Sequence, residues 1–215
     1  MRRLILSGIL SFLLTEPAFC QDTPKISPAS KTLLEDFLSS EGYRTFAEIA
    51  FNQIEPPPLR AECPHLTIAG NVKLYTPLTE VSVIGESPNR LIANGAWVSV
   101  VDFDRCGKTV RRRALMRADD KGAIRPVGLL PGDFRGDLIL EHDAIWIVTP
   151  TMMASPACMD RNQFFVTDVS RSETKPNGDW TELWTASACG KAMSTEVSYG
   201  RVAEGIVVTA NAHKQ

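Results

Sequence analysis

The pattern of apolar residues changes its period part-way along the chain. Between residues 30 and 55, apolar residues recur every three or four positions, which is typical of amphipathic helices. Glu41-Gly42 interrupts the pattern, so we expect two helical segments. Ser27-Pro28 supplies an N-cap and a proline at the first helical position. Pro56-Pro57-Pro58 cannot continue the second segment and predicts an extended chain up to Cys63. The apolar residues of the two segments are Leu33, Leu34, Phe37, Leu38, Phe46, Ile49 and Ala50.

From Leu66 onward, apolar and polar residues alternate as they do in β-strands. In the longest predicted strand, Trp97, Val101 and Phe103 fall on one face. The chain reverses at Cys106-Gly107-Lys108, where the glycine can take the positive φ that a reversal needs. The predicted strands are Val72–Tyr75, Glu80–Ile84, Trp97–Arg105, Thr109–Arg117, Ala123–Val127 and Phe164–Val169.

The region Asn94–Val127 occurs twice. Shifted by 83 residues without a gap, it falls on Asn177–Ala210. Both copies begin with Asn-Gly, a tight-turn signal of the kind found in hairpins. Trp97 meets Trp180, and the Cys-Gly-Lys sequence is repeated. Because Trp and Cys are rare residue types, these matches indicate an internal duplication.

The two copies also predict which strand face is buried. On the strand after the Cys-Gly-Lys turn, one set of alternate positions stays apolar in both copies although its residues change, as expected of a buried sheet face. On the other set, Arg111 and Arg113 are replaced by Ser194 and Glu196. We therefore expect that second face to be exposed to solvent, with Arg112 a polar residue on the buried face.

The segment Asp137–Thr149 has two possible structures. Its place in the repeat favours a helix capped by Asp137, and we expect a helix here. The run from Ala144 to Thr149 would also form a buried strand, starting at Ile145. The first copy further contains about a dozen extra residues around Pro77–Arg90, which could form an added hairpin.

These elements predict an α+β fold, made by tandem duplication of a helix followed by a disulfide-braced antiparallel β-sheet. We expect a signal peptide over residues 1–20 and a disordered lead-in over 21–29. The first repeat then spans 30–130 and the second 131–215. One continuous sheet and two separate sheets both fit this pattern.

The first twenty residues predict export. Met1-Arg2-Arg3 is basic, Leu4–Leu14 is apolar, and a small-x-small site ends at Cys20, so the segment resembles a signal peptide cleaved after Cys20. Lipidation of Cys20 is the less favoured alternative, because Phe19 stands where a lipoprotein signal has a small residue. No later stretch is long and apolar enough to span a bilayer. We therefore expect a periplasmic or secreted protein.

Cleavage would leave four cysteines, namely Cys63, Cys106, Cys158 and Cys189. An even number in an exported chain predicts two disulfides. Of the three possible pairings we favour Cys63–Cys106 with Cys158–Cys189, because each bridge then closes a local loop. A zinc site at Cys63-Pro64-His65 is the weaker alternative, since no Cys-x-x-Cys spacing accompanies it.

The charge of the chain is mild, and its one local concentration is basic. Removal of residues 1–20 leaves a net charge of about −3, which does not suggest nucleic acid as a partner. Arg111, Arg113 and Arg117 form a candidate binding patch for an acidic protein, a polyanionic glycan or a lipid headgroup. The alternative is that these charges protect a sheet edge from pairing with another chain.

Sequence motifs for catalysis are missing. There is no Gly-x-Ser-x-Gly, no phosphate-binding glycine loop and no His-Glu-x-x-His. Glu141-His142-Asp143 is not expected to converge, because consecutive helical residues point about 100° apart. We therefore predict no cofactor and no metal, and favour a non-catalytic binding or inhibitor-like module. The alternatives are a structural envelope component and a hydrolase using carboxylates such as Asp102, Asp104, Asp119 and Asp120.

The predicted plan, a small disulfide-containing α/β unit present twice, resembles that of the bacterial β-lactamase inhibitory protein. The resemblance lies in the arrangement of the elements. No motif of the chain matches that family, so the resemblance is an analogy at the level of the fold.

Overall fold

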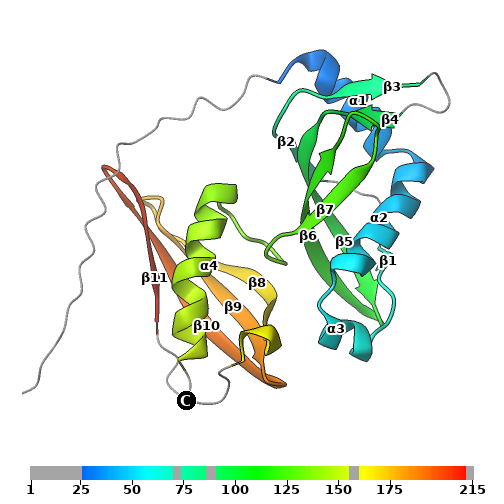
Figure 1. Cartoon of the computed structure of the whole chain (residues 1–215). Helices are drawn as coiled ribbons and strands as arrows, with labels where there is room; N and C mark the ends of the chain where they lie inside the picture. The colour runs from blue at the N-terminus through cyan, green and yellow to red at the C-terminus, as the bar shows by residue number, and fades with distance from the viewer. Residues whose placement is uncertain (1–25, 70–73, 86–90, 155–159, 212–215) are drawn as a thin grey trace, which may run out of the picture.

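The structure, a computed structural model, describes residues 26–69, 74–85, 91–154 and 160–211 (Figure 1). Its helices and strands form two units side by side, which we call the N-terminal unit (residues 26–128) and the C-terminal unit (residues 138–211). A connector, residues 129–137, joins them. The predicted signal peptide, most of the predicted lead-in and Cys158 lie outside the described residues.

The two predicted N-terminal helices are confirmed as α1 (Pro28–Leu38) and α2 (Glu41–Ile54). Ser27 caps α1, because its hydroxyl accepts a hydrogen bond from the Ser30 N–H at 3.2 Å. Ser40 caps α2 in the same way, by accepting from the Tyr43 N–H at 3.1 Å. The break between the helices is therefore a second N-cap, placed one residue before the expected interruption.

The extended chain expected after the three prolines is wrong. Pro57–Glu62 forms a short helix, α3. Pro57 and Pro58 lie in the first turn of α3. Backbone N–H groups of a first turn have no acceptor within the helix, so proline, which lacks an N–H, is tolerated there. The Cys63 N–H then donates to the Leu59 carbonyl at 3.1 Å and closes the last turn. The backbone becomes extended only at Cys63.

The N-terminal unit contains a five-stranded antiparallel sheet in which β5 and β6 form the central hairpin. The strands are β1 (Thr67–Ile68), β2 (Leu74–Pro77), β5 (Ala96–Arg105), β6 (Lys108–Ala118) and β7 (Ile124–Gly128). A separate two-stranded ladder is formed by β3 (Ser82–Ile84), within the stretch Pro77–Arg90, and β4 (Leu91–Ala93), directly after it. The Asn94-Gly95 turn leads from β4 into β5, which do not pair with each other, so it is not a hairpin turn.

The C-terminal unit has one long helix, α4 (Leu138–Met153), packed on one four-stranded antiparallel sheet (Figure 1). The helix prediction is confirmed: Asp137 caps α4 by accepting from the Leu140 N–H at 2.8 Å. A short 3-10 helix, η1 (Arg161–Gln163), precedes the sheet. The strand order is β11-β10-β9-β8, so β8 and β11 are the edges. The strands are β8 (Phe164–Thr174), β9 (Trp180–Ala188), β10 (Lys191–Val202) and β11 (Gly205–Ala210).

The central hairpins of the two units have the same register. Trp97 lies opposite Met116, and Trp180 lies opposite Tyr199, 83 residues further on in each strand. Both hairpins turn through a Cys-Gly pair with positive φ, at 50° and 83° in the first and 49° and 75° in the second. The left-handed conformation costs glycine little, which explains why glycine takes the second position. The sheets themselves are separate, which answers the question of one sheet or two.

Each unit has its own hydrophobic core, and a tryptophan of the central hairpin lies in each. Trp97, Val101 and Phe103 are buried together in the N-terminal unit, as their alternation predicted. Trp180 and Trp184 are buried in the C-terminal unit. No helix in the described ranges is both long enough and apolar enough to cross a membrane.

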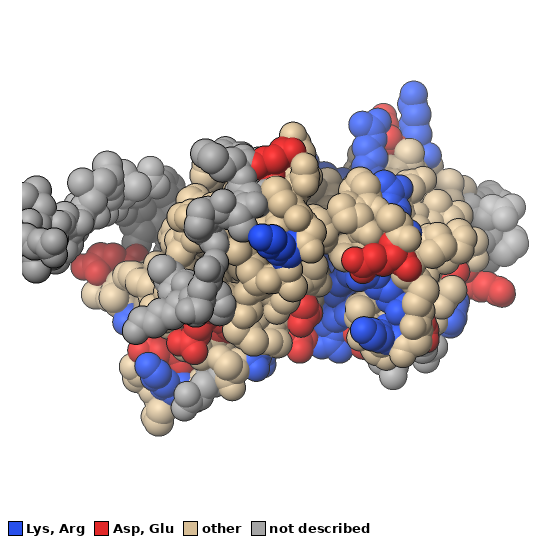
Figure 2. All heavy atoms as spheres, turned by 90° about the horizontal axis from the view of Figure 1, so that it is seen from below, with Lys and Arg blue, Asp and Glu red and all other residues tan. Residues whose placement is uncertain are grey.

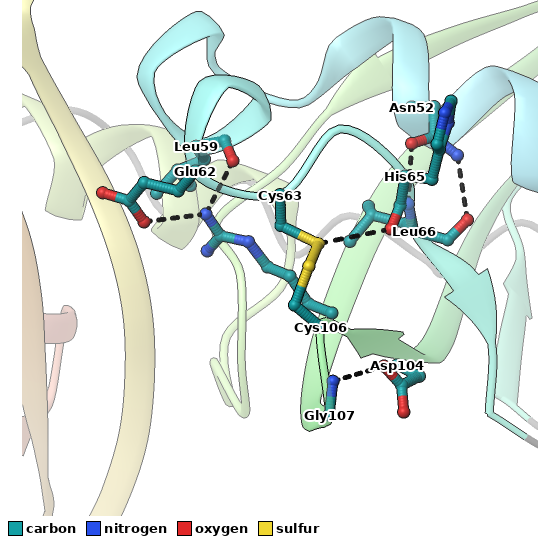
Figure 3. Close-up of a disulfide and its surroundings, with 10 residues drawn as sticks. Asn52, Leu59, Glu62, Cys63, His65, Leu66, Asp104, Cys106 and Gly107 are labelled. Atoms are coloured by element: carbon teal, nitrogen blue, oxygen red, sulfur yellow. Dashed lines mark hydrogen bonds and ion pairs between the residues drawn. A yellow bond between two sulfur atoms is a disulfide. The ribbon is translucent and has the colours of Figure 1, made fainter.

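The Cys63–Cys106 disulfide is confirmed and fastens α3 to the β5–β6 turn (Figure 3). The Cα atoms are 6.0 Å apart and 43 residues separate the two cysteines, so the chain-entropy model gives about 4 kcal/mol of stabilisation. Arg105 reinforces the junction by donating to the Leu59 carbonyl at 2.9 Å. Because Cys63 is oxidised, it cannot supply a thiolate to the zinc site considered above. Cys189 is also disulfide-bonded, whereas Cys158, its predicted partner, lies outside the described residues.

Candidate functional site

Arg111 is the most accessible of the three consecutive arginines, with 34% of its side chain exposed. Its guanidinium binds both oxygens of Asp102, at 2.7 and 3.0 Å, and also binds Asp133 of the connector. These carboxylates raise the pKa of Arg111 further above its ordinary value. Two acidic neighbours therefore already neutralise this member of the predicted patch.

Arg112 points to the opposite face and is buried, as the alternation predicted. It forms a two-pronged ion pair with Glu55 at 2.7 and 2.9 Å. Glu55 is the C-terminal cap of α2, so this pair joins the end of α2 to the centre of the sheet. Arg112 also reaches the Thr167 carbonyl of β8, at 3.5 Å, and so touches the C-terminal unit.

Arg113 is buried, with 8% of the residue exposed, so the expectation that it lies on a solvent-exposed face is wrong. The connector and α4 cover this part of β6. Arg113 pairs with Glu141 of α4 at 2.9 Å, and its guanidinium lies 5.4 Å from the centre of the Phe134 ring. Removing either partner of such a buried ion pair is strongly destabilising, because the charge of the other partner would remain buried without compensation.

Arg117 is exposed and lies opposite Arg125 of β7. The structure therefore does not bring Arg111, Arg113 and Arg117 together on one surface. Arg117 lies where β7 pairs with β6, so it is not at a sheet edge. Beside Arg111 and Arg113 the connector takes the place of β7, because the Gly132 and Leu129 N–H groups donate to their carbonyls at 3.0 and 3.1 Å. On the face in Figure 2, basic and acidic side chains lie interspersed among uncharged ones. Binding of an acidic partner through Arg111 and Arg117 remains a prediction.

The connector and the arginines hold the two units against each other. The Asp133 N–H donates to the Val169 carbonyl of β8 at 2.6 Å, and the Gly132 N–H donates to the Arg111 carbonyl at 3.0 Å. A side chain at Gly132 would collide with the β8 backbone, since a Cβ there would stand 2.1 Å from the Val169 oxygen. Gly132 also has φ of +79°, which favours glycine.

A groove of about 430 Å³ opens beside this junction, between α4, the connector and the start of β8. This volume falls within the range of small-ligand sites. Most of the lining is apolar. The lining residues are Gly128, Leu129, Leu130, Pro131, Leu138, Glu141, His142, Ile145, Thr149, Phe164, Phe165 and Val166.

The one carboxylate in the groove lining is Glu141, and its charge is compensated. Glu141 accepts hydrogen bonds from Arg113 at 2.9 Å and from the Leu130 N–H at 2.5 Å. Burial raises the pKa of Glu141, and this effect outweighs the opposing influence of Arg113. The lining therefore offers no unpaired carboxylate to a ligand.

His142, which lines the groove, contacts the exposed Trp146 of α4. Trp146 is 66% exposed, and its indole N–H donates to His142 Nε2 at 2.9 Å. His142 in turn contacts Asp143 at 3.3 Å, whereas Glu141 points into the protein. Glu141, His142 and Asp143 therefore do not converge on one point, as the helical geometry predicted.

Three of the carboxylates named for the hydrolase alternative form hydrogen bonds or ion pairs that stabilise turns and the sheet. Asp102 pairs with Arg111, and Asp104 accepts from the Gly107 N–H in the β5–β6 turn. Asp119 accepts from the N–H groups of Lys121 and Ala123 at 3.0 and 2.9 Å. Among the described residues, no group of three histidine, cysteine, aspartate or glutamate side chains could hold a metal ion.

The C-terminal core contains a fully buried carboxylate that was not among the predicted site residues. Glu182 accepts from the indole N–H groups of Trp180 and Trp184, at 3.2 and 3.1 Å, and from the Arg135 N–H at 3.0 Å. The signal was present, because Glu182 alternates with Trp180 and Trp184 on the face predicted to be buried. Its counterpart 83 residues earlier is Ser99, which is also fully buried.

Comparison with known proteins adds no family: no protein-family model, no curated protein and no solved structure is significantly similar to the chain.

Proposed function

We propose that this is an exported, non-catalytic binding protein, which holds its ligand in the groove between α4 and the start of β8. The groove carries the proposal, because it is apolar, open to solvent and large enough for a ligand. The buried Arg113–Glu141 ion pair links α4 to β6 beside the groove, so α4 is held in place before a ligand binds.

The surface of α4 supports the same assignment. Apolar residues occur around its whole circumference, and Ile139, Ile145, Trp146 and Ile147 remain exposed although the other face is buried. Helices that are apolar on all sides are usually covered on all sides. An exposed apolar surface next to a groove is typical of a binding site.

Tandem duplication and export belong to this proposal. The shared register and the shared Cys-Gly turns support descent of both hairpins from one ancestral unit. The Cys63–Cys106 disulfide supports an oxidising compartment. Peptide mapping without reduction should find Cys158 linked to Cys189, and any other partner for Cys189 would contradict one disulfide per repeat.

The groove is tested with a neutral apolar dye, Nile red, and a matched pair of variants. Ile145 lines the groove and is 38% exposed, whereas Ile147 is 41% exposed on the same helix and does not line it. In Ile145→Glu, the dye should bind about tenfold more weakly, because a carboxylate would lose its hydration in an apolar site.

Ile147→Glu should bind the dye as the wild type does. Thermal unfolding of both variants confirms that they are folded. Equal binding by all three proteins, or no saturable binding by the wild type, would contradict the groove as a ligand site.

A further inference from the structure

The groove runs along the edge of β8 and not over one of its faces. Phe164, Phe165 and Val166 are consecutive, and all three line it. Neighbouring residues of a strand point to opposite faces of the sheet. A cavity lined by three residues in succession therefore borders the edge of the strand.

The backbone groups that face this groove follow from the β8–β9 ladder. The Cys189 N–H donates to the Gln163 carbonyl at 3.1 Å, and Phe165 lies opposite Ser187. In an antiparallel pair, alternate residues exchange hydrogen bonds with the partner strand. The N–H and C=O groups of Gln163 and Phe165 therefore face β9, and those of Phe164 and Val166 face outward.

In the described part of the chain, no strand lies beside β8 on its outer side. Further along that side, the Thr167 and Val169 carbonyls already accept hydrogen bonds from Arg112 and from the Asp133 N–H. The groove thus begins where the connector stops covering the strand. An extended polypeptide backbone is the ligand that satisfies a row of outward N–H and C=O groups.

We infer that the groove binds an extended, uncharged and apolar polypeptide segment of a partner protein, which adds as a strand to the edge of β8 beneath α4. This inference rests on the proposed function and names its ligand class. The lining residues of α4 run from Leu138 to Thr149, a rise of about 16 Å at about 1.5 Å per residue. About five residues of extended chain match that length, and those opposite Phe164–Val166 would pair with β8.

The charge of the groove selects the side chains of this segment. Glu141 is already paired with Arg113 and with the Leu130 N–H, so a basic ligand side chain would find no unpaired carboxylate in the lining. Both basic and acidic side chains would lose hydration without gaining an ion pair. Uncharged apolar side chains complement the lining.

The inference is tested with the folded, oxidised protein and a displayed library of random ten-residue peptides. We expect enrichment of apolar sequences that bind the wild type and Ile147→Glu but bind Ile145→Glu about tenfold more weakly. A selected peptide is then synthesised with one N-methyl group at each position in turn. Strand pairing predicts strong loss of binding at two residues, two positions apart, which face the backbone groups of Phe164 and Val166. N-methylation of the residue between them, and of the remaining residues, should change binding little.

Amide exchange provides a second readout with an internal control. Bound peptide should slow exchange of the Phe164 and Val166 amides, whereas Phe165 should change little because its amide already faces β9. Loss of binding on N-methylation without alternation, or unchanged exchange at Phe164 and Val166, would overturn strand addition.

The two proposals fail separately. If Nile red binds in an Ile145-dependent manner but the library yields no peptide, the groove stands as a ligand site and the peptide inference is wrong. If neither the dye nor any peptide depends on Ile145, both are wrong.

Discussion

The two units place a tryptophan-bearing hairpin with the same register in their cores, but they differ in how that hairpin is covered. In the N-terminal unit, α1, α2 and the β3–β4 ladder contribute to one core around Trp97. In the C-terminal unit, α4 is the one long helix packed on the sheet, and much of its own apolar surface stays exposed. Packing within the fold therefore buries only part of the apolar surface of α4. The part left exposed makes the C-terminal unit the better candidate for ligand binding.

The units also differ at one equivalent buried position. Ser99 contacts the Trp97 indole N–H at 3.1 Å and the Tyr43 hydroxyl at 2.6 Å. Glu182, its counterpart, accepts three N–H groups. The acceptor for the buried indole N–H groups is thus a neutral hydroxyl in one core and a carboxylate in the other. Either group can be buried at this position because the surrounding hydrogen-bond donors have an acceptor.

The largest effect should come from removal of this carboxylate. Glu182→Ala leaves two indole N–H groups and one backbone N–H buried without an acceptor, and should cost at least about 3 kcal/mol in the free energy of unfolding. Ser99→Ala should cost about 1–2 kcal/mol. Urea unfolding of both variants gives the comparison. Equal costs would show that Glu182 is not the main acceptor of its core.

An intermediate effect is expected for the pH dependence of Glu141. Its pKa is raised by burial, so the folded state binds the proton more tightly than the unfolded state does. The stability of the wild type should therefore fall as pH rises from about 4.3, the ordinary value for glutamate, through the raised pKa. Glu141→Gln has no such titration.

The free energy of unfolding of the wild type should accordingly decline relative to Glu141→Gln as pH rises above about 4.3. Asp143→Asn, a change at an exposed carboxylate of the same helix, is the control for altered net charge. A difference that stays constant with pH, or that grows in favour of the wild type, would contradict a raised pKa.

The smallest effects distinguish two buried tyrosines, each 1% exposed. The Tyr43 hydroxyl is hydrogen-bonded to Ser99, whereas the Tyr199 hydroxyl, although near Glu182, makes no hydrogen bond of normal geometry. Tyr43→Phe should cost about 1 kcal/mol and Tyr199→Phe about zero. Urea unfolding measures both, and a larger cost for Tyr199→Phe would reverse the comparison.

The sequence predicted the central hairpins and the caps of α1 and α4, because each depends on residues close together in the chain or on strict alternation. It predicted the Cys63–Cys106 disulfide because this pairing closes a shorter loop than the alternatives. It failed at Pro57–Glu62, where proline ended one helix and also began another. It failed at Arg113, because alternation shows which face a residue occupies and not what covers that face. The groove could not be predicted, since it requires α4, the connector and the edge of β8 to meet in space. Glu182 could have been found from its place between two tryptophans.

The most direct test of the account maps Nile red onto the protein by amide chemical shifts. We predict shifts confined to α4 between Leu138 and Thr149, to the connector and to Phe164–Val166, with none in the β5–β6 hairpin of the N-terminal unit. Shifts centred on the N-terminal unit, or spread evenly over both units, would contradict the claim that the ligand site belongs to the α4–β8 groove.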